Sequence, residues 1–197
     1  MLTFSQAAEN NKIHICDRLC DVLKPCRHLL EIGSGTGQHA TYMAPRLPQL
    51  VWQTSELAEN LENVLARLEA EGAENIRTPI KLDVSAHPWG LSACDVIYSA
   101  NTVHIMSWAH VEHLFRGVGE ILENNGFLCL YGPYKYNGEF TTPSNQRFDQ
   151  WLKDQDPVSG IRDFEAVDEL AQDHGLVLRE DFAMPANNQL LVWQRSP

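Results

Sequence analysis

A glycine-rich turn between an expected strand and an expected helix constrains the fold of this chain more than any other feature. Residues 28–32 form a short apolar run, residues 33–37 read Gly-Ser-Gly-Thr-Gly, and a helical pattern begins at Gln38. Glycines permit positive φ angles and the close approach of a ligand, and the start of a helix presents unpaired N–H groups. Such a turn at the carboxyl end of a strand is typical of α/β proteins that bind nucleotides or nucleosides.

The rest of the chain alternates strand-like apolar runs with amphipathic helical stretches. Strands are expected at residues 28–32, 50–54, 80–82, 95–99, 127–131, 176–182 and 189–194. Helices are expected at residues 13–23, 38–44, 57–72, 111–122, 145–153 and 163–174, with an irregular stretch at 132–144. Asp163 is expected as the N-cap of the last helix, with Gly175 just past its end. The alternation predicts a mostly parallel sheet covered by helices on both faces, with an antiparallel strand pair at one edge.

Length and charge narrow the class of protein. A chain of 197 residues fits one domain, so we expect a single domain over residues 1–197. The balance of 15 Lys+Arg against 26 Asp+Glu gives a net charge of −11, which disfavours nucleic acids and anionic membranes as partners. We find no signal peptide and no apolar stretch that could span a membrane. Five cysteines without a Cys-x-x-Cys pair favour a reduced, cytoplasmic protein.

Acidic residues lie at the ends of three successive expected strands. Glu31 precedes the glycine turn, Glu56 follows the second strand about 20 residues beyond it, and Asp83 follows the third strand. A carboxylate at the position of Glu56 can accept both hydroxyls of a ribose. The alternatives are a solvated acid at a helix start for Glu56, an Asx turn for Asp83, and a tight structural turn for the glycines.

The pattern Glu-x-Gly-x-Gly-x-Gly at residues 31–37 resembles motif I of the class I S-adenosylmethionine (SAM) methyltransferases. The wider chain is similar to a poorly characterised family of SAM-methyltransferase-like proteins that includes animal methyltransferase-like protein 26. Asn10, where that family has Arg, and Ser159, where an aromatic residue is usual, are departures. The matching segments are Phe4-Ser5, Ala7-Ala8, Asn11-Lys12, Ser34–His39, Ala100-Asn101, His104-Ile105, Tyr131–Tyr134, Pro143–Asn145, Phe148-Asp149, Gly160–Asp163 and Met184–Asn188.

The resemblance implies a Rossmann-like class I methyltransferase fold with a seven-stranded, mostly parallel sheet in the order 3-2-1-4-5-7-6 and an antiparallel C-terminal strand. It implies SAM as cofactor and S-adenosyl-L-homocysteine (SAH) as product. Glu31 would help to hold the amino end of SAM, and Asp83 would take the adenine amino group beside an apolar contact. The residues expected at the cofactor are Glu31, Gly33, Ser34, Gly35, Gly37, Glu56, Asp83, Val84, Asn101, Asn11 and Lys12.

An N-terminal lid over about residues 1–24 is implied by related enzymes, in which such segments fold over the cofactor. Asn11 and Lys12 would then reach the site from this lid, and the alternative is that they lie in a solvated helix start. The long stretch at 132–144 could form a second lid, because it exceeds the length of a simple connection.

Candidate residues for the methyl acceptor follow the fourth and fifth strands. His104 could be a general base, which is needed only if the acceptor must lose a proton, or an orienting donor, or a structural histidine. Asn101 could contact the adenosyl group or the acceptor, or form a turn. Tyr131 and Tyr134 could wall an apolar substrate pocket, to which His104 would also contribute, or pack on the surface.

The sequence therefore predicts SAM-dependent methyl transfer to a small molecule. A non-catalytic SAM-binding protein is the alternative, and a nicotinamide-dependent oxidoreductase is disfavoured because Gln38 replaces the third glycine of the dinucleotide fingerprint. No metal is expected, because His104, His110 and His113 have no carboxylate or cysteine at ligand spacing. Nothing in the sequence indicates an oligomeric state.

Overall fold

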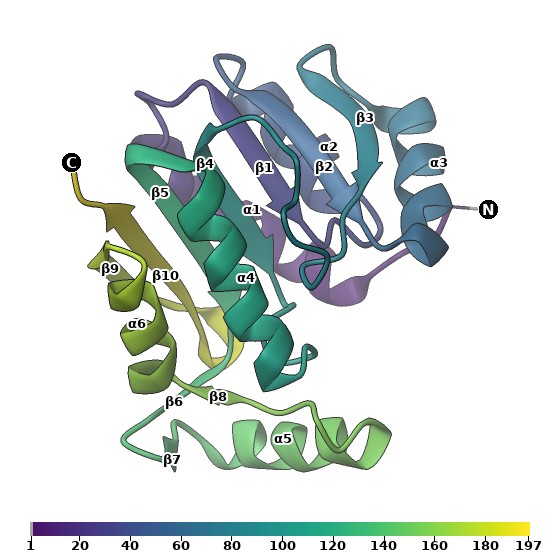
Figure 1. Ribbon diagram of the computed structural model, residues 1–197. Helices are drawn as coiled ribbons and strands as arrows, with labels where there is room; N and C mark the ends of the chain where they lie inside the picture. Colours follow the sequence, from purple (N-terminus) through teal and green to yellow (C-terminus); the bar gives the residue numbers. More distant parts are fainter. Residues whose placement is uncertain (1) are drawn as a thin grey trace.

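A computed structural model describes residues 2–197 and has a seven-stranded sheet at its centre (Figure 1). The strand order is β3-β2-β1-β4-β5-β10-β9, and every neighbouring pair up to β5 is parallel. Strand β10 is antiparallel to both of its neighbours. The predicted strand order and antiparallel C-terminal strand are confirmed. The strands are β1 (His28–Ile32), β2 (Val51–Glu56), β3 (Ile76–Lys81), β4 (Cys94–Ala100), β5 (Leu122–Gly132), β9 (Leu176–Met184) and β10 (Asn188–Arg195).

Helices cover both faces of this sheet (Figure 1). Helices α1 and α2 lie over one face, α4 and α6 lie over the other, and α3 packs against β2 and β3. Serine or threonine side chains cap three helix starts, since Ser5, Ser107 and Thr142 accept backbone N–H groups at the starts of α1, α4 and α5. The helices are α1 (Gln6–Val22), α2 (Gln38–Met43), α3 (Leu61–Glu71), α4 (Trp108–Ile121), α5 (Pro143–Gln155) and α6 (Phe164–Asp173).

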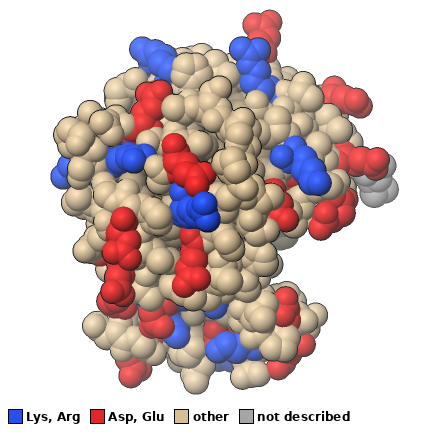
Figure 2. All heavy atoms as spheres, viewed as in Figure 1, with Lys and Arg blue, Asp and Glu red and all other residues tan. Residues whose placement is uncertain are grey.

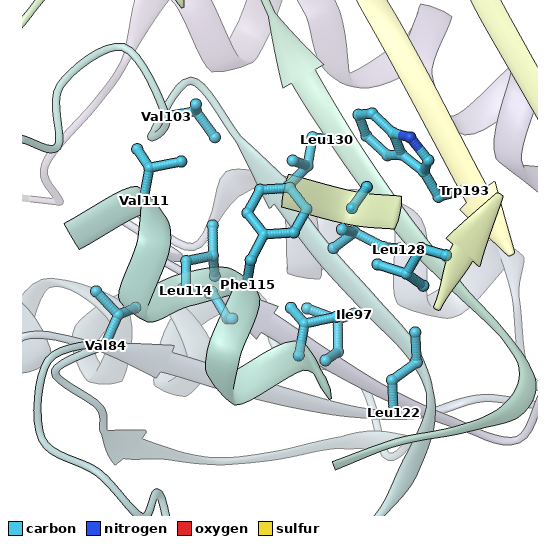
Figure 3. Close-up of a cluster of buried hydrophobic side chains, with 14 of the residues drawn as sticks. Val84, Ile97, Val103, Val111, Leu114, Phe115, Leu122, Leu128, Leu130 and Trp193 are labelled. Atoms are coloured by element: carbon cyan, nitrogen blue, oxygen red, sulfur yellow. The ribbon is translucent and has the colours of Figure 1, made fainter. Parts of the chain in front are cut away.

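Two hydrophobic cores result, one on each face of the sheet. In the core under α4 and α6, the rings of Phe115 and Trp193 meet edge to face at 6.4 Å (Figure 3). The core under α1 and α2 contains Trp52 and Tyr98. Because side chains alternate along a strand, β1 gives Leu30 and Ile32 to the first core. The same alternation directs Glu31 toward the face covered by α1 and α2.

The stretch expected to be irregular contains a second, three-stranded sheet. Strands β6 (Tyr134–Tyr136) and β7 (Glu139–Phe140) form a hairpin whose turn uses positive φ angles at residues 137 and 138. Strand β8 (Arg162–Asp163) pairs parallel with β6. The prediction of an irregular loop is therefore wrong here, because strands of two or three residues are too short to show alternation.

Several predicted boundaries shift for local reasons. Strand β3 begins at Ile76 rather than at residue 80, since Pro79 lies within an edge strand, where a missing N–H is tolerated. Helix α5 begins at Pro143, and proline suits the first turn of a helix. Asp163 stands at the N-cap of α6 without a capping bond, and its carboxylate instead pairs with Lys135 at 3.0 Å.

The two edge strands of the large sheet, β3 and β9, contain features that disfavour pairing with a further strand. At one edge, β3 carries Pro79. At the other edge, β9 carries three successive charged residues, Arg179, Glu180 and Asp181, and its pairing with β10 is interrupted by a bulge at Val192/Trp193.

Charged side chains are interspersed over the face that carries α4 and α6, without an extended basic patch in that view (Figure 2). The part of the molecule that contains α5 lies below this face, and a notch separates the two at the right of the view. Within residues 2–197, no helix is long and apolar enough to cross a lipid bilayer.

Candidate functional site

The glycine loop, residues 33–37, joins β1 to α2 at the carboxyl end of the sheet. Gly33, Gly35 and Gly37 have φ angles of 70°, 57° and 73°, which side chains rarely adopt. Two of these positions are also crowded, because a Cβ would lie 2.7 Å from Thr102 at Gly33 and 3.0 Å from Arg67 at Gly37. At Gly35 nothing lies within 4 Å of such a Cβ, so the middle of the loop is open to a ligand.

Glu56, at the end of β2, is bonded to this loop. Its Oε2 accepts the N–H of Gly35 at 2.7 Å, and its Oε1 accepts the N–H of Leu57 at 2.8 Å. The side chain is buried. The alternative of a solvated acid at a helix start is therefore wrong, and the carboxylate belongs to the wall of the loop.

Glu31 lies beneath the loop as a buried carboxylate. Its Oε2 accepts the Ser34 hydroxyl and the Trp52 indole N–H, each at 3.0 Å. Burial raises the pKa of Glu31 to about 7, and the nearby charge of Glu56 adds to this shift. Among residues 2–197, no Lys, Arg or His forms an ion pair with Glu31. A buried acid without a cationic partner suits a ligand that brings its own positive charge.

Asp83 and Val84 follow β3. One oxygen of Asp83 accepts both the N–H and the hydroxyl of Ser85, at 2.9 Å and 2.7 Å, and these bonds lower the pKa of Asp83. This is the geometry of an Asx turn, and it leaves the second oxygen of the carboxylate without a bond in the described chain. Val84 is buried, and its carbonyl accepts the Trp89 indole N–H.

The N-terminal residues expected at the cofactor lie against the start of α2. Asn11 is buried and its Oδ1 lies 2.7 Å from Nε2 of His39. Burial and the neighbouring charge of Lys12 lower the pKa of His39 to about 4, so this imidazole is neutral near pH 7. Lys12 pairs with Glu9 at 2.6 Å.

His104 occupies the loop between β4 and α4 and is buried. Burial, helped by the charge of Arg162, lowers its pKa to about 4. Its ring meets Phe148 of α5 edge to face at 5.5 Å, and the missing side chain of Gly132 leaves space beside Nδ1. No side-chain bond holds the imidazole in the described chain, although its carbonyl accepts the N–H of Gly160 at 2.9 Å.

The other residues expected near the methyl acceptor, Asn101, Tyr131 and Tyr134, lie in different surroundings. Asn101 has a φ angle of 59° and donates its N–H to the carbonyl of Tyr131, so it extends the parallel pairing of β4 and β5 by one bond where β4 ends. Tyr131 is buried beside Asn11 and Asn188. Burial raises the pKa of Tyr131, and the side chains of Asn11 and Asn188 partly offset this rise. Tyr134 belongs instead to the hydrophobic core under α4 and α6. The prediction that Tyr134 walls a pocket is therefore not supported by its position.

Two residues that sequence reasoning missed connect the loop to its surroundings. Arg67 of α3 is buried and donates to the carbonyls of Thr36 and Thr3. Gln38 is also buried and bonds to the N-terminal helix. A signal for Arg67 was present, because it lies three positions after the buried Val64 and therefore on the inward face of α3.

Residues 2–197 also contain a cavity away from this site, and they contain no cluster of possible metal ligands. Within residues 2–197, no three His, Cys, Asp or Glu side chains are grouped as metal ligands. A cavity of about 430 Å³ is lined by residues that begin β1, β2 and β4, so it lies at the opposite end of the sheet from the glycine loop.

Comparison with known proteins gives a family and a fold. A family model described as "Protein of unknown function (DUF938)" matches residues 2–195. Similar solved structures include an O-methyltransferase family protein from Burkholderia thailandensis, with 14% identity and a TM-score of 0.79 over 95% of this chain. The mitomycin 7-O-methyltransferase has 15% identity and a TM-score of 0.79 over 94% of this chain.

An O-methyltransferase family 2 protein from Planctomyces limnophilus, solved with apigenin, has 16% identity and a TM-score of 0.78 over 96% of this chain. The chain spans 58%, 54% and 60% of the lengths of these three proteins. At such identities the likeness shows the fold, which is the Rossmann-like class I methyltransferase fold predicted from the sequence.

Proposed function

The chain belongs to the DUF938 family of proteins of unknown function, and we propose that it is a SAM-dependent methyltransferase that acts on a small molecule. The observation that carries this proposal is the buried carboxylate of Glu31, which lies beneath an open glycine loop without a cationic partner in the described chain. A cationic cofactor that binds through backbone and carboxylate groups fits this arrangement. The O-methyltransferases of similar fold support the same cofactor.

The residues of the loop and the strand ends would hold SAM. Glu31 would attract its ammonium group, Glu56 would accept ribose hydroxyls, and the free oxygen of Asp83 would accept the adenine amino group beside Val84. Gly33, Ser34, Gly35, Gly37 and Asn101 would present backbone groups, and Asn11 and Lys12 would close the site from an N-terminal lid over about residues 1–24. When bound, SAM supplies an activated methyl group.

His104 is the residue best placed to take a proton from an acceptor. It is neutral near pH 7 because its pKa lies at about 4, its ring makes no hydrogen bond to another side chain in residues 2–197, and it lies after β4 at the carboxyl end of the sheet. A neutral imidazole can accept a proton or orient a hydroxyl. Asn101 and Tyr131 lie nearby, bonded to each other through the backbone, and would help to shape the acceptor pocket.

We propose a hydroxyl of a small organic molecule as the first acceptor class to test, because the similar structures are named as O-methyltransferases. The acidic composition argues against nucleic acids and membranes as partners. The five cysteines are free thiols, which supports a cytoplasmic location. The shared motifs support kinship with the group that includes animal methyltransferase-like protein 26.

Calorimetry with SAM, SAH and NAD tests the cofactor. We expect SAM and SAH to bind and NAD not to bind. Binding of NAD alone would overturn the proposal in favour of an oxidoreductase. Incubation with methyl-labelled SAM and a pool of hydroxylated metabolites then tests the activity, and SAH binding without any methyl transfer would indicate a non-catalytic SAM-binding protein.

A further inference from the structure

The N-terminal segment, defined here as residues 2–12, contacts the glycine loop through polar side chains, and Ala8 is the one apolar residue of this segment that is buried. Residues 2–5 belong to no strand in the described chain, and Phe4 is 58% exposed. We propose that Arg67 and Gln38 are positioning residues that hold this segment across the glycine loop and thereby bring Asn11 and Lys12 to the cofactor. The proposal rests on the cofactor site proposed above.

Arg67 joins three elements through one buried guanidinium. Its Nε donates to the carbonyl of Thr36 in the glycine loop at 3.2 Å, and one Nη donates to the carbonyl of Thr3 at 2.6 Å. The other Nη donates to both carboxylate oxygens of Glu71, at 2.9 Å and 3.0 Å. The planar guanidinium presents several N–H groups in fixed directions. In Figure 1 the first described residues pass beside α3, which carries Arg67.

The hydrocarbon stem of Arg67 also fixes the loop. It packs against Gly37, where an added Cβ would lie 3.0 Å and 3.2 Å from the Arg67 Cγ and Cβ. The third glycine of the loop therefore serves two purposes, because it permits a φ angle of 73° and leaves space for this stem.

Gln38 makes the second set of bonds. Its Oε1 accepts the N–H of Ser5 at 2.7 Å and the hydroxyl of Thr36 at 2.9 Å, while its Nε2 donates to Glu9 at 2.9 Å. This residue occupies the position at which the dinucleotide fingerprint has glycine. A glycine there would lose every one of these bonds, so the departure from the fingerprint has a structural purpose in this chain.

These bonds place the N-terminal helix relative to the loop. Glu9, which accepts from Gln38, also pairs with Lys12, and it lies two residues, about half a helical turn, before Asn11 of the buried Asn11–His39 contact. Side chains with many polar atoms are seldom buried unless those atoms are paired. Removing Arg67 or Gln38 leaves buried partners unsatisfied at the boundary between the segment and the loop, which favours release of the segment.

The experiment compares Arg67→Gln and Gln38→Met with wild type and with Arg116→Gln. Arg116 is a matched control, because it pairs with Glu120 four residues ahead on α4, as Arg67 does with Glu71 on α3. Hydrogen exchange at residues 3–12 is followed by mass spectrometry with and without SAH, SAH affinity is measured by calorimetry, and the melting temperature is recorded.

We expect both variants to exchange at least about tenfold faster at residues 3–12 without SAH, and to bind SAH about 10- to 150-fold more weakly. SAH should protect these residues in wild type and in Arg116→Gln and fail to do so in the two variants. A variant that only melts earlier while keeping SAH affinity and protection would overturn the proposal, as would unchanged exchange. If Arg67→Gln does not fold, the hydrogen exchange and SAH affinity of Gln38→Met alone test the proposal. If wild type does not bind SAH, the proposed cofactor is wrong, and exchange without SAH still tests the fastening.

Discussion

Substitution of Glu31 by Gln should change how the stability of this protein depends on pH. In the folded protein, burial raises the pKa of Glu31 from its ordinary value of 4.5 to about 7. Unfolding returns the carboxyl group to water, where it ionises more readily. Wild type therefore loses stability as the pH rises from about 4.5 to about 7, and glutamine, which has no proton to lose, removes this loss.

The magnitude follows from the two pKa values. Between pH 5 and pH 8, the ionisation of Glu31 should lower the free energy of unfolding of wild type by about 2.5 kcal/mol relative to Glu31→Gln. His39 and His104, whose pKa values are lowered to about 4, destabilise both proteins as the pH falls below about 6.5, so their effect cancels in the comparison. Glutamine keeps an oxygen that can accept from Trp52 and Ser34.

Urea unfolding of both proteins at pH 5 and pH 8, followed by tryptophan fluorescence, measures this difference. With an ordinary dependence on urea, the variant should gain about 1 M in its midpoint relative to wild type between the two pH values. Glu69→Gln, at an exposed position on α3, is the control and should follow wild type. Parallel pH dependence of Glu31→Gln and wild type would show that Glu31 is already ionised in the folded protein and would refute the reasoning. Gain of stability with loss of SAM binding would mark Glu31 as a residue retained for its ligand.

Further outcomes follow from the same site. Glu56→Ala should weaken SAM binding by about 10- to 150-fold in calorimetry and also lower the melting temperature, because the buried carboxylate accepts the N–H of Gly35; unchanged affinity would contradict its role. His104→Asn should slow methyl transfer by about 10²- to 10⁴-fold while leaving SAM affinity within a few-fold of wild type. In wild type at saturating SAM, where protonation of Glu31 no longer limits cofactor binding, a pKa of about 4 for His104 should keep the rate level from pH 8 down to about pH 5, and a decline below about pH 6.5 would argue against this pKa. Elemental analysis should find no stoichiometric zinc, and chelators should leave SAH binding unchanged; one zinc per chain would direct attention to His104, His110 and His113.

The large sheet could be predicted from the sequence because its signals are local. The central strands contain short apolar runs, such as residues 96–98, 128–131 and 190–193, and the covering helices repeat apolar residues at helical spacing. The small sheet could not be predicted, since β7 and β8 are only two residues long and depend on pairing with β6 across a gap in the sequence. The start of β3 at Ile76 could not be predicted, because Pro79 lies inside the strand and proline is uncommon within strands other than edge strands.

The sequence could also predict which residues lie at the ends of the strands near the site. It could not predict which side chains these residues contact. Parallel strands bring their carboxyl ends to one edge, so Glu31 and Glu56 had to lie near the glycine loop. That Glu31 is buried against Trp52, and that Gln38 reaches Ser5, depends on contacts between residues 21 and 33 positions apart. The burial of Tyr134 could not be predicted for a similar reason, because it depends on the placement of β6 against the core under α4 and α6.

The edges of the large sheet limit how copies of this protein can associate. An exposed edge strand offers N–H and C=O groups to a strand from another molecule, and this is a common route to aggregates. Pro79 removes one backbone N–H group from β3. Strand β9 carries the charged residues Arg179, Glu180 and Asp181, and the adjacent bulge increases its twist. A continuous intermolecular sheet is therefore disfavoured at both edges of the large sheet.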